Sequence, residues 1–374
     1  MSKVIFYFSD WNANVIRREE NTYGGVGYYR IIKPSQQVKG HEVTVVGQEL
    51  TKKGETMEER WERIFSEYDV FWCNYFADPK EASALFSVRD RLKKKVVIDC
   101  DDNFLDVHES HPLYDKLKGG KRDKAFMITI LSFADVLTVS TEPLKQRFVK
   151  HFREVQNIEK KIVVIPNMND IAEWNFTPAP KHEDKIVIGY LGSNSHQDDL
   201  AMFIPHLMQI MRKYKNVYFE TIGAIGAKDL HYFKDFTSEE MNRCDLFPAT
   251  WTYRDMPKMI SELKWDIAVA PLVDSAFTRC KSHIKFLEMS AMKFPVIASR
   301  VYPYFMDIQG KKVIDNEVTG LLVKPSQWFS AMEDLILNKD KRIKLGENAY
   351  KHVVENWQYK DSNLSSLIDK VLAN

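Results

Sequence analysis

One segment of the sequence gathers basic and acidic side chains directly in front of an apolar run. They are Arg279, Lys281, Lys285 and Glu288. The pattern predicts a helix over about 284–292 with Ser282 as its N-cap. Arg279 and Lys281 would then stand at the helix N-terminus, where the helix dipole disfavours cations. A bound anion removes this conflict, and a diphosphate is the natural candidate.

The same helix offers a second contact to a nucleotide. Glu288 would lie a turn or more inside it and could accept hydrogen bonds from ribose hydroxyls. Lys285 would add positive charge beside the diphosphate. The alternative is a plain Lys285–Glu288 pair on an exposed helix surface, worth about 0.3 kcal/mol. The cations at the helix start favour the nucleotide site.

Three aspartates follow another apolar run: Asp99, Asp101 and Asp102. Carboxylates at a strand end can hold sugar hydroxyls, a metal ion or the proton of an incoming nucleophile. The alternative is that one of them caps the next helix. Three together favour a functional cluster. His108 follows as a weaker candidate, because a lone histidine is more often a packing or surface residue.

Two glycine-containing turns complete the set. Gly24, Gly25 and Gly27 allow positive φ and a close approach of backbone to ligand. Arg30 follows about one helical turn later, with a solvated surface position as the alternative. These glycines do not form the dinucleotide fingerprint G-x-G-x-x-G. The second turn holds residues that can cap the next helix at the cleft: Gly192, Ser193, Asn194, Ser195 and His196.

All these candidates follow short apolar runs that are typical of buried strands. The first series covers 4–8, 42–46, 70–73, 96–100, 136–139 and 162–165, and the second covers 186–191, 218–222, 267–270, 296–298 and 321–323. Helix-compatible segments alternate with them, which predicts two doubly wound, parallel α/β sheets. Ligands bind outside the carboxyl ends of such strands. Two facing sheets would therefore bring the candidates to one cleft.

The chain divides accordingly. We expect an N-terminal Rossmann-like domain over 1–174 and a linker over 175–185, where prolines and charges show no periodicity. A second Rossmann-like domain would cover 186–355. A closing helix within 356–374 would pack back on the N-terminal domain.

Composition excludes several classes of protein. Of 374 residues, 44% are hydrophobic and 28% charged, with a net charge of +1. No global field therefore recruits nucleic acid or an anionic membrane. The four cysteines match neither a zinc site nor a disulfide scaffold, which favours a reducing, cytoplasmic location. The N-terminal apolar run is too short for a signal peptide, and no stretch approaches the ~20 residues that span a bilayer. Peripheral membrane contact stays open.

Three segments, "GGVG", "IVIGYLGSNSHQDDL" and "RCKSHIKFLEMSAMKFPVIAS", together resemble the GT-B-fold glycosyltransferases of family 4. The resemblance implies two Rossmann-like domains facing across a cleft. It implies a UDP- or GDP-sugar donor held mainly by the C-terminal domain, an acceptor held mainly by the N-terminal one, and retention of anomeric configuration. It implies no obligatory cofactor or metal.

Carried over to this chain, the resemblance gives roles to single residues. Glu288 matches the second glutamate of the family's E-x7-E motif, the ribose ligand. Cys280 stands where the first glutamate, which often holds the donor sugar, is expected. Ser193 and Asp198 replace the usual Arg and Lys. The positive charge would then come from Lys281, Arg279 and Lys285.

Other residues receive supporting roles from the same resemblance. His196 and Asp199 match a branch motif, and we include His196 among the catalytic candidates. Asp101 and Asp102 would position the acceptor or the donor sugar. No covalent nucleophile is required.

Three functions stay open. The first is a glycosyltransferase, with a polysaccharide, a lipid-linked glycan or a small molecule as acceptor. A protein or nucleic-acid acceptor stays open too, although the near-zero charge disfavours DNA. The second is a related enzyme such as a nucleotide-sugar 2-epimerase or a phosphorylase. The third is a non-catalytic two-domain binding protein.

Overall fold

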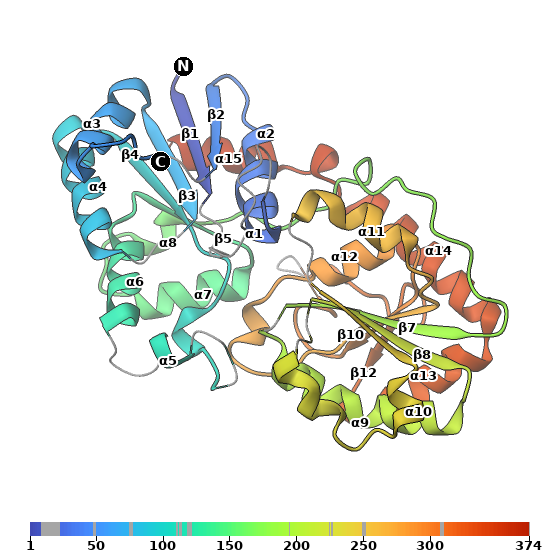
Figure 1. The fold of residues 1–374 in the computed structure, drawn as a ribbon. Helices are drawn as coiled ribbons and strands as arrows, with labels where there is room; N and C mark the ends of the chain where they lie inside the picture. The colour runs from blue at the N-terminus through green and yellow to red at the C-terminus, as the bar shows by residue number, and fades with distance from the viewer. Residues whose placement is uncertain are drawn as a thin grey trace.

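Two parallel β-sheets, one in each half of the chain, form the centre of the computed structural model (Figure 1). The structure describes residues 1–8, 23–47, 50–74, 78–109, 111, 114–117, 122–193, 195–223, 225, 227–248, 252–306 and 310–373. Asn194, a predicted site residue, lies outside this part of the chain.

The N-terminal sheet has the strand order β2-β1-β3-β4-β5-β6. Its strands are β1 (Lys3–Phe8), β2 (Glu42–Gly47), β3 (Val70–Asn74), β4 (Lys95–Asp99), β5 (Val136–Val139) and β6 (Ile162–Val164). The helices between them are α1 (Gly25–Gly27), α2 (Lys33–Gln36), α3 (Met57–Glu67), α4 (Pro79–Leu92), α5 (Tyr114–Leu117), α6 (Arg122–Phe133), α7 (Glu142–His151) and α8 (Ile158–Lys161). A π-helical stretch, Tyr28–Ile32, joins α1 to α2.

The C-terminal sheet has the order β12-β11-β10-β7-β8-β9. Its strands are β7 (Ile186–Leu191), β8 (Val217–Ile222), β9 (Cys244–Phe247), β10 (Ile267–Ala270), β11 (Val296–Ser299) and β12 (Leu321–Val323). Its helices are α9 (Gln197–Lys213), α10 (Ser238–Met241), α11 (Met256–Glu262), α12 (Ile284–Ala291), α13 (Trp328–Leu337) and α14 (Lys339–Asn356). This order is the Rossmann order, and it confirms the predicted doubly wound fold.

The inner strands of both sheets are buried on both faces, as is typical of all-parallel sheets, whereas the edge strands β2 and β9 are half-buried to exposed. In β1, Ile5 packs with residues of α3, α4 and α6, whereas Val4 and Phe6 face the opposite core. In β7, Ile188 packs with residues of α9 and α13, whereas Val187 faces the opposite core. This burial explains the continuous apolar runs that marked the strands in the sequence.

Strand β9 is the element that the sequence interpretation missed. It has four residues, Cys244–Phe247, which alternate between half-buried and exposed, and it pairs only with β8 at the sheet edge. A short edge strand lacks the continuous apolar run of its neighbours. It carries no comparable sequence signal.

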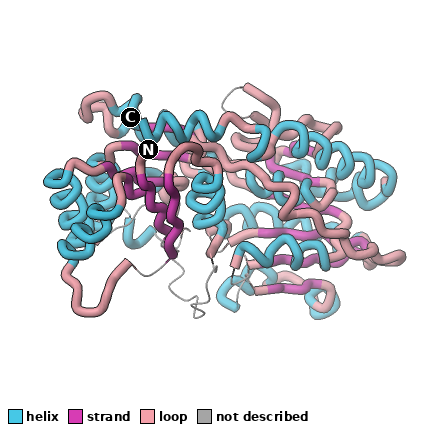
Figure 2. Tube along the Cα trace, turned by 90° about the horizontal axis from the view of Figure 1, so that it is seen from above, coloured by secondary structure: helices cyan, strands magenta, loops and turns pink. Residues whose placement is uncertain are grey.

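The last helix, α15 (Leu364–Ala373), returns to the N-terminal domain and packs on α2 and β6. Lys95, at the start of β4, donates from Nζ to the carbonyl oxygens of Val371 (2.6 Å) and Leu372 (3.0 Å). These bonds satisfy carbonyl groups of the last helical turn. Both termini therefore lie on the N-terminal domain (Figures 1 and 2). The domain limits given above stay a prediction.

The loop between β10 and α12 connects the two domains. Its 3₁₀ turn, Thr278–Cys280, packs against the N-terminal domain, and Cys280 belongs to the hydrophobic core of that domain. Thr141 Oγ1 donates to the Cys280 carbonyl oxygen at 2.7 Å, and Asn103 Nδ2 donates to the Ala276 carbonyl oxygen at 3.0 Å. This loop is therefore positioned by the domain opposite its own.

A buried ion pair lies in the N-terminal domain just behind this loop. Arg30 and Asp99 are each 1% exposed, with Arg30 Nη2 2.7 Å and Nε 3.0 Å from the two Asp99 carboxylate oxygens. Arg30 also donates to the Ile165 carbonyl oxygen and to Asn167. Thr138 completes the coordination of Asp99 at 2.6 Å. Arg30 is thus not solvated, and its guanidinium group is taken up by Asp99 and is not available to a bound anion. Asp99 in turn is not part of an open acidic cluster.

Arg30→Ala should therefore lower the free energy of unfolding by about 3–5 kcal/mol, because it leaves the Asp99 carboxylate buried without its cation. Chemical denaturation monitored by circular dichroism measures this loss. The matched control is Arg91→Ala, which removes the exposed ion pair with Glu62 and should cost at most about 1 kcal/mol. Equal losses in the two variants would contradict the role given to the buried pair.

Candidate functional site

A cavity of about 380 Å³ opens between the two domains. Its walls come from the loops after β1, β4, β5 and β6 on one side, and from those after β7, β8 and β10 with the start of α12 on the other. The structure brings twelve predicted residues to this cavity. They are Gly24, Gly25, Asp101, Asp102, Gly192, Ser193, Ser195, His196, Lys281, Ser282, Lys285 and Glu288.

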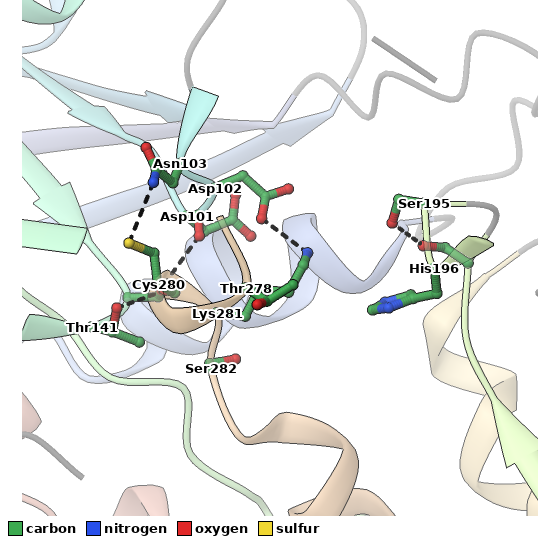
Figure 3. A network of polar contacts seen from close by, with 12 residues as sticks. Asp101, Asp102, Asn103, Thr141, Ser195, His196, Thr278, Cys280, Lys281 and Ser282 are labelled. Carbon is green, nitrogen blue, oxygen red and sulfur yellow. Dashed lines mark hydrogen bonds and ion pairs between the residues drawn. The ribbon is translucent and has the colours of Figure 1, made fainter. Parts of the chain in front are cut away.

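Lys281 links the domains across the cavity. Its Nζ lies 3.2 Å from Asp102 Oδ1 and 4.6 Å from the centre of the Phe277 ring. Figure 3 shows Lys281 between Asp102 and the ring of His196. Burial alone would raise the pKa of Asp102, but Lys281 and His111 hold it below its usual value. The Lys281 ammonium group is thus held in place near the N-terminus of α12.

Asp101 lies beside this pair with a different charge balance. Burial, followed by the neighbouring Asp102 and Asp99 carboxylates, raises the pKa of Asp101 to about 7. The two aspartates therefore differ in protonation: Asp101 favours the neutral acid, and Asp102 favours the carboxylate. Neither caps a helix, because the following 3₁₀ turn has Asn103 as its N-cap residue, without a side-chain hydrogen bond.

Lys285 points from α12 to Tyr190. Its Nζ lies 3.2 Å from the Tyr190 hydroxyl and 4.9 Å from the ring centre. Burial lowers the pKa of Lys285 to about 7. The expected alternative, a Lys285–Glu288 surface pair, does not form in the described structure. A lysine held half-desolvated gains from any anion that reaches the cavity.

Glu288 is 4% exposed and accepts hydrogen bonds from two tyrosines of opposite domains. Tyr253 and Tyr29 donate to the same oxygen, Oε1, at 2.5 Å and 3.2 Å. Burial raises the pKa of Glu288 to about 7, against the lowering effect of the two phenols. Because both phenols bind Oε1, Oε2 is the oxygen that a ligand in the cavity can approach.

His196 forms a pair with Asp199 at the start of α9. Nδ1 of His196 lies 2.6 Å from Asp199 Oδ2, and Asp199 Oδ1 accepts from the Val273 backbone N–H at 2.6 Å. Burial and the nearby Lys285 lower the pKa of His196 to about 4. The imidazole is therefore neutral at physiological pH. With the carboxylate accepting from Nδ1–H, Nε2 keeps its lone pair.

The predicted cap of α12 is wrong. Ser282 does not cap α12; its Oγ accepts from Asn167 Nδ2 at 2.9 Å, and the N-cap residue is His283 with no side-chain cap bond. Ser193 bonds Ser195 at 2.8 Å, and α9 also starts without a side-chain cap. Among the described residues, no side chain therefore caps the start of α12.

The glycine prediction needs correction as well. Gly25 and Gly27 do not take positive φ; they form the short helix α1. Gly25 lines the cavity, but Gly27 is buried, and a Cβ there would lie 3.3 Å from Phe8. Gly192 is required sterically, since a Cβ would come within 2.6 Å of the Tyr190 hydroxyl.

Three other candidates lie outside the cavity. Arg279 is an exposed side chain bound to Asp274 at 2.6 Å, because it projects from the solvent side of the 3₁₀ turn. Cys280 projects into the N-terminal core, so it does not replace a donor-sugar ligand. His108 Nδ1 lies 2.7 Å from Asp198 Oδ2 in the opposite domain.

Sequence reasoning missed the aromatic part of the site. Tyr29, Tyr190, Tyr253 and Tyr304 surround Glu288 and Lys285. The sequence could have indicated Tyr29, because it follows the glycine turn at helical spacing. Tyr253 gave no signal, because its segment reaches Glu288 only through the folding of the domain.

The described residues contain no group of three or more His, Cys, Asp or Glu side chains suited to hold a metal ion. Within the same residues, no helix is long and apolar enough to cross a membrane.

Comparison with solved structures supports the fold. HepE from Anabaena, in complex with UDP and glucose, is 12% identical, and each chain covers all of the other with a TM-score of 0.64. An α-glucosyltransferase in complex with UDP and a 13-mer DNA containing an HMU base is 10% identical, with 99% of each chain covered and a TM-score of 0.67. These likenesses confirm the GT-B fold.

A third structure is longer than this chain. TarM from S. aureus, in complex with Fondaparinux, alpha-GlcNAc-glycerol and UDP, is 14% identical with a TM-score of 0.58. The match covers 84% of this chain and 58% of TarM, so this chain spans little more than half of that protein. No protein-family model matches the sequence, and no curated protein matches it significantly.

Glu288→Gln should change how stability depends on pH. The pKa of Glu288 is raised from 4.5 to about 7 in the folded protein. The stability that it contributes is therefore fully present below about pH 4.5 and lost as pH rises through 7. Thermal unfolding of both proteins between pH 4.5 and 8 should show the wild-type Tm falling relative to the variant. A constant difference across this range would contradict the assignment.

Proposed function

We propose that the protein is a glycosyltransferase that moves a sugar from a nucleoside-diphosphate sugar to an acceptor hydroxyl. The observation that carries the proposal is the convergence of Lys281, Lys285 and the uncapped start of α12 on one interdomain cavity, with Glu288 one turn further along. Cations and free backbone N–H groups suit a diphosphate, and a carboxylate suits the ribose hydroxyls.

The proposed donor carries uridine. The three neighbouring proteins described above were each solved with UDP. GDP stays the second choice. We further propose that the chain belongs to the family 4 type and retains anomeric configuration. NMR analysis of the anomeric coupling in donor and product would test retention.

The proposed chemistry is stabilisation of a leaving group. As the glycosyl–phosphate bond breaks, negative charge develops on the diphosphate. Lys281 and the α12 N–H groups are already fixed at that place, so little reorganisation is needed when the charge appears. No metal ion enters this scheme.

The carboxylates and the imidazole have supporting parts in the proposal. Asp101 and Asp102 lie on the N-terminal side of the cavity, where they would orient the donor sugar or the acceptor hydroxyl. His196, neutral and held by Asp199, would accept a hydrogen bond from the sugar through Nε2. Tyr29 and Tyr253 would hold Glu288 at the ribose.

The acceptor is proposed only as a class. HepE, TarM and the α-glucosyltransferase were solved with glucose, with a glycosylated glycerol and with DNA, respectively. A glycan, a lipid-linked sugar or a small polyol is the preferred class here. A modified nucleic-acid base stays open, and incubation with donor and acceptor panels separates these from a 2-epimerase, which needs no acceptor.

UDP should raise the melting temperature more than GDP, ADP or CDP in a thermal-shift screen. A ligand at one hundred times its Kd stabilises the folded state by about 2.7 kcal/mol. The shift should disappear in Lys281→Ala. Absence of a shift with every nucleotide would count against a nucleotide site.

Lys281→Ala should lower turnover by about 10²–10³-fold, because one fixed donor to the developing charge is lost. Its Tm should stay near that of the wild type, since the ion pair with Asp102 is partly exposed. The assay is release of nucleotide from the donor in the presence of acceptor. Arg279→Ala is the matched control, because this cation of the same loop lies outside the cavity. A loss of turnover in Arg279→Ala equal to that in Lys281→Ala would contradict the proposed diphosphate site.

A further inference from the structure

The carboxylate of Glu288 lies at the boundary between the two domains. Glu288 belongs to α12 in the C-terminal domain, but one of the two phenols that bind its Oε1 belongs to the N-terminal domain. That phenol is Tyr29, whose hydroxyl donates to Oε1 at 3.2 Å. Tyr253, from the 3₁₀ turn before α11, donates to the same oxygen at 2.5 Å. The orientation of this carboxylate is therefore set by both domains.

The second carboxylate oxygen of Glu288 is left for a ligand. Oε2 has no hydrogen-bond partner among the described residues, and it is not one of the fully buried unpaired atoms. Glu288 lines the interdomain cavity, so a ligand there can reach Oε2. A carboxylate oxygen that accepts no bond within the protein suits hydroxyl donors on a ligand.

The Tyr29 ring is held in place by its neighbours. Tyr29 is 5% exposed and belongs to the π-helical stretch Tyr28–Ile32. Its ring packs edge-on against Tyr28, with ring centres 4.8 Å apart, and against Tyr253, with ring centres 5.2 Å apart. The hydroxyls of Tyr29 and Tyr253 also contact each other. Packing thus fixes where the Tyr29 hydroxyl points, and a fixed donor holds Oε1 in one orientation.

Backbone contacts bring the two tyrosines together across the domain boundary. The Tyr253 N–H donates to the Tyr23 carbonyl oxygen at 2.7 Å. Gly25 packs on the Tyr253 ring, since a Cβ there would lie 3.5 Å from it. Because Tyr29 and Glu288 belong to different domains, their hydrogen bond requires the domains to approach each other as they do here.

We propose that Tyr29 is a positioning residue for the donor nucleotide: it holds Oε1 of Glu288 so that Oε2 faces the ribose hydroxyls. This inference rests on the proposed function and deepens it. The family resemblance implies a donor held mainly by the C-terminal domain, whereas the Tyr29 contact gives the N-terminal domain a part in recognising it. A nucleotide without ribose hydroxyls gains nothing from a positioned Glu288, so the contact favours ribonucleotides.

A purely structural role of the Tyr29 hydroxyl leads to a different result. Tyr29→Phe keeps the ring and its packing and removes only the hydroxyl. If that hydroxyl merely supports the fold, its loss weakens every ligand of the cavity alike. If it positions Glu288, its loss weakens only ligands that carry ribose hydroxyls. Two nucleotides therefore separate the two roles.

Isothermal titration with UDP and with 2′,3′-dideoxy-UDP, which lacks both ribose hydroxyls, tests the inference. Tyr29→Phe should weaken UDP at least about fivefold, the scale of coupling between members of one hydrogen-bond network. The dideoxy nucleotide should bind Tyr29→Phe and the wild type within about twofold of each other. In a Glu288→Gln background, Tyr29→Phe should have no further effect on UDP, because the carboxylate that it positions is gone.

Tyr28→Phe is the matched control. Tyr28 is the adjacent residue of the same π-helical stretch, it is 2% exposed, and its hydroxyl donates to Glu173 instead of Glu288. Tyr28 is not among the described residues that line the cavity. This variant also loses one hydrogen bond from a phenol to a carboxylate, but it should bind both nucleotides like the wild type.

The outcomes separate this inference from the proposed function. Equal weakening of both nucleotides in Tyr29→Phe, unchanged UDP affinity in that variant, or the same loss in Tyr28→Phe overturns the positioning role and leaves the nucleotide site standing. Failure of the wild type to bind any nucleotide overturns the proposed function, and the positioning role with it.

Steady-state kinetics of sugar transfer give a second measurement. Tyr29→Phe should raise the donor KM by the same factor as the UDP Kd and leave kcat within about twofold, because the lost contact is made equally in the ground state and the transition state. A lower kcat at unchanged donor KM overturns the positioning role.

Discussion

The position of the loop between β10 and α12 is the constraint on which the rest of the site depends. This loop belongs to the C-terminal domain but is held by the N-terminal one, through Thr141, Asn103 and the burial of Cys280. Its next residue, Lys281, extends past the Phe277 ring to Asp102 and the cavity. A flexible lysine becomes a fixed charge because its backbone is anchored on both sides, and fixed charges are what electrostatic catalysis requires.

The anchoring continues into the interior of the N-terminal domain. The Arg30–Asp99 pair holds Asn167, and Asn167 donates to Ser282 at the start of α12. Desolvating two charges is costly, and this cost is offset only when every polar atom finds a partner, as it does here through Thr138 and Ile165. Polar residues at strand ends thus serve to fix the loop as well as to line the cavity.

The charged groups of the cavity are held in a partly desolvated state. Burial moves the pKa of Lys285 and of Glu288 toward 7, and it keeps His196 neutral. Tyrosine hydroxyls are the hydrogen-bond partners of Lys285 and Glu288, whereas the Asp199 carboxylate is the partner of His196. Groups tuned in this way respond strongly to an incoming ligand, and clusters of shifted pKa values are typical of functional sites.

The sequence by itself determined the alternation of strands and helices, and it placed Lys281, Lys285, Glu288 and His196 in the segments that follow strands. Parallel strands buried on both faces need continuous apolar runs, and their carboxyl ends must meet at one edge. Only the tertiary structure decided where each side chain points. Arg279 and Lys281 are two residues apart, yet one faces solvent and the other the cavity. Tyr253 and Glu288 come from segments that are far apart in the chain, so no local pattern could reveal their contact.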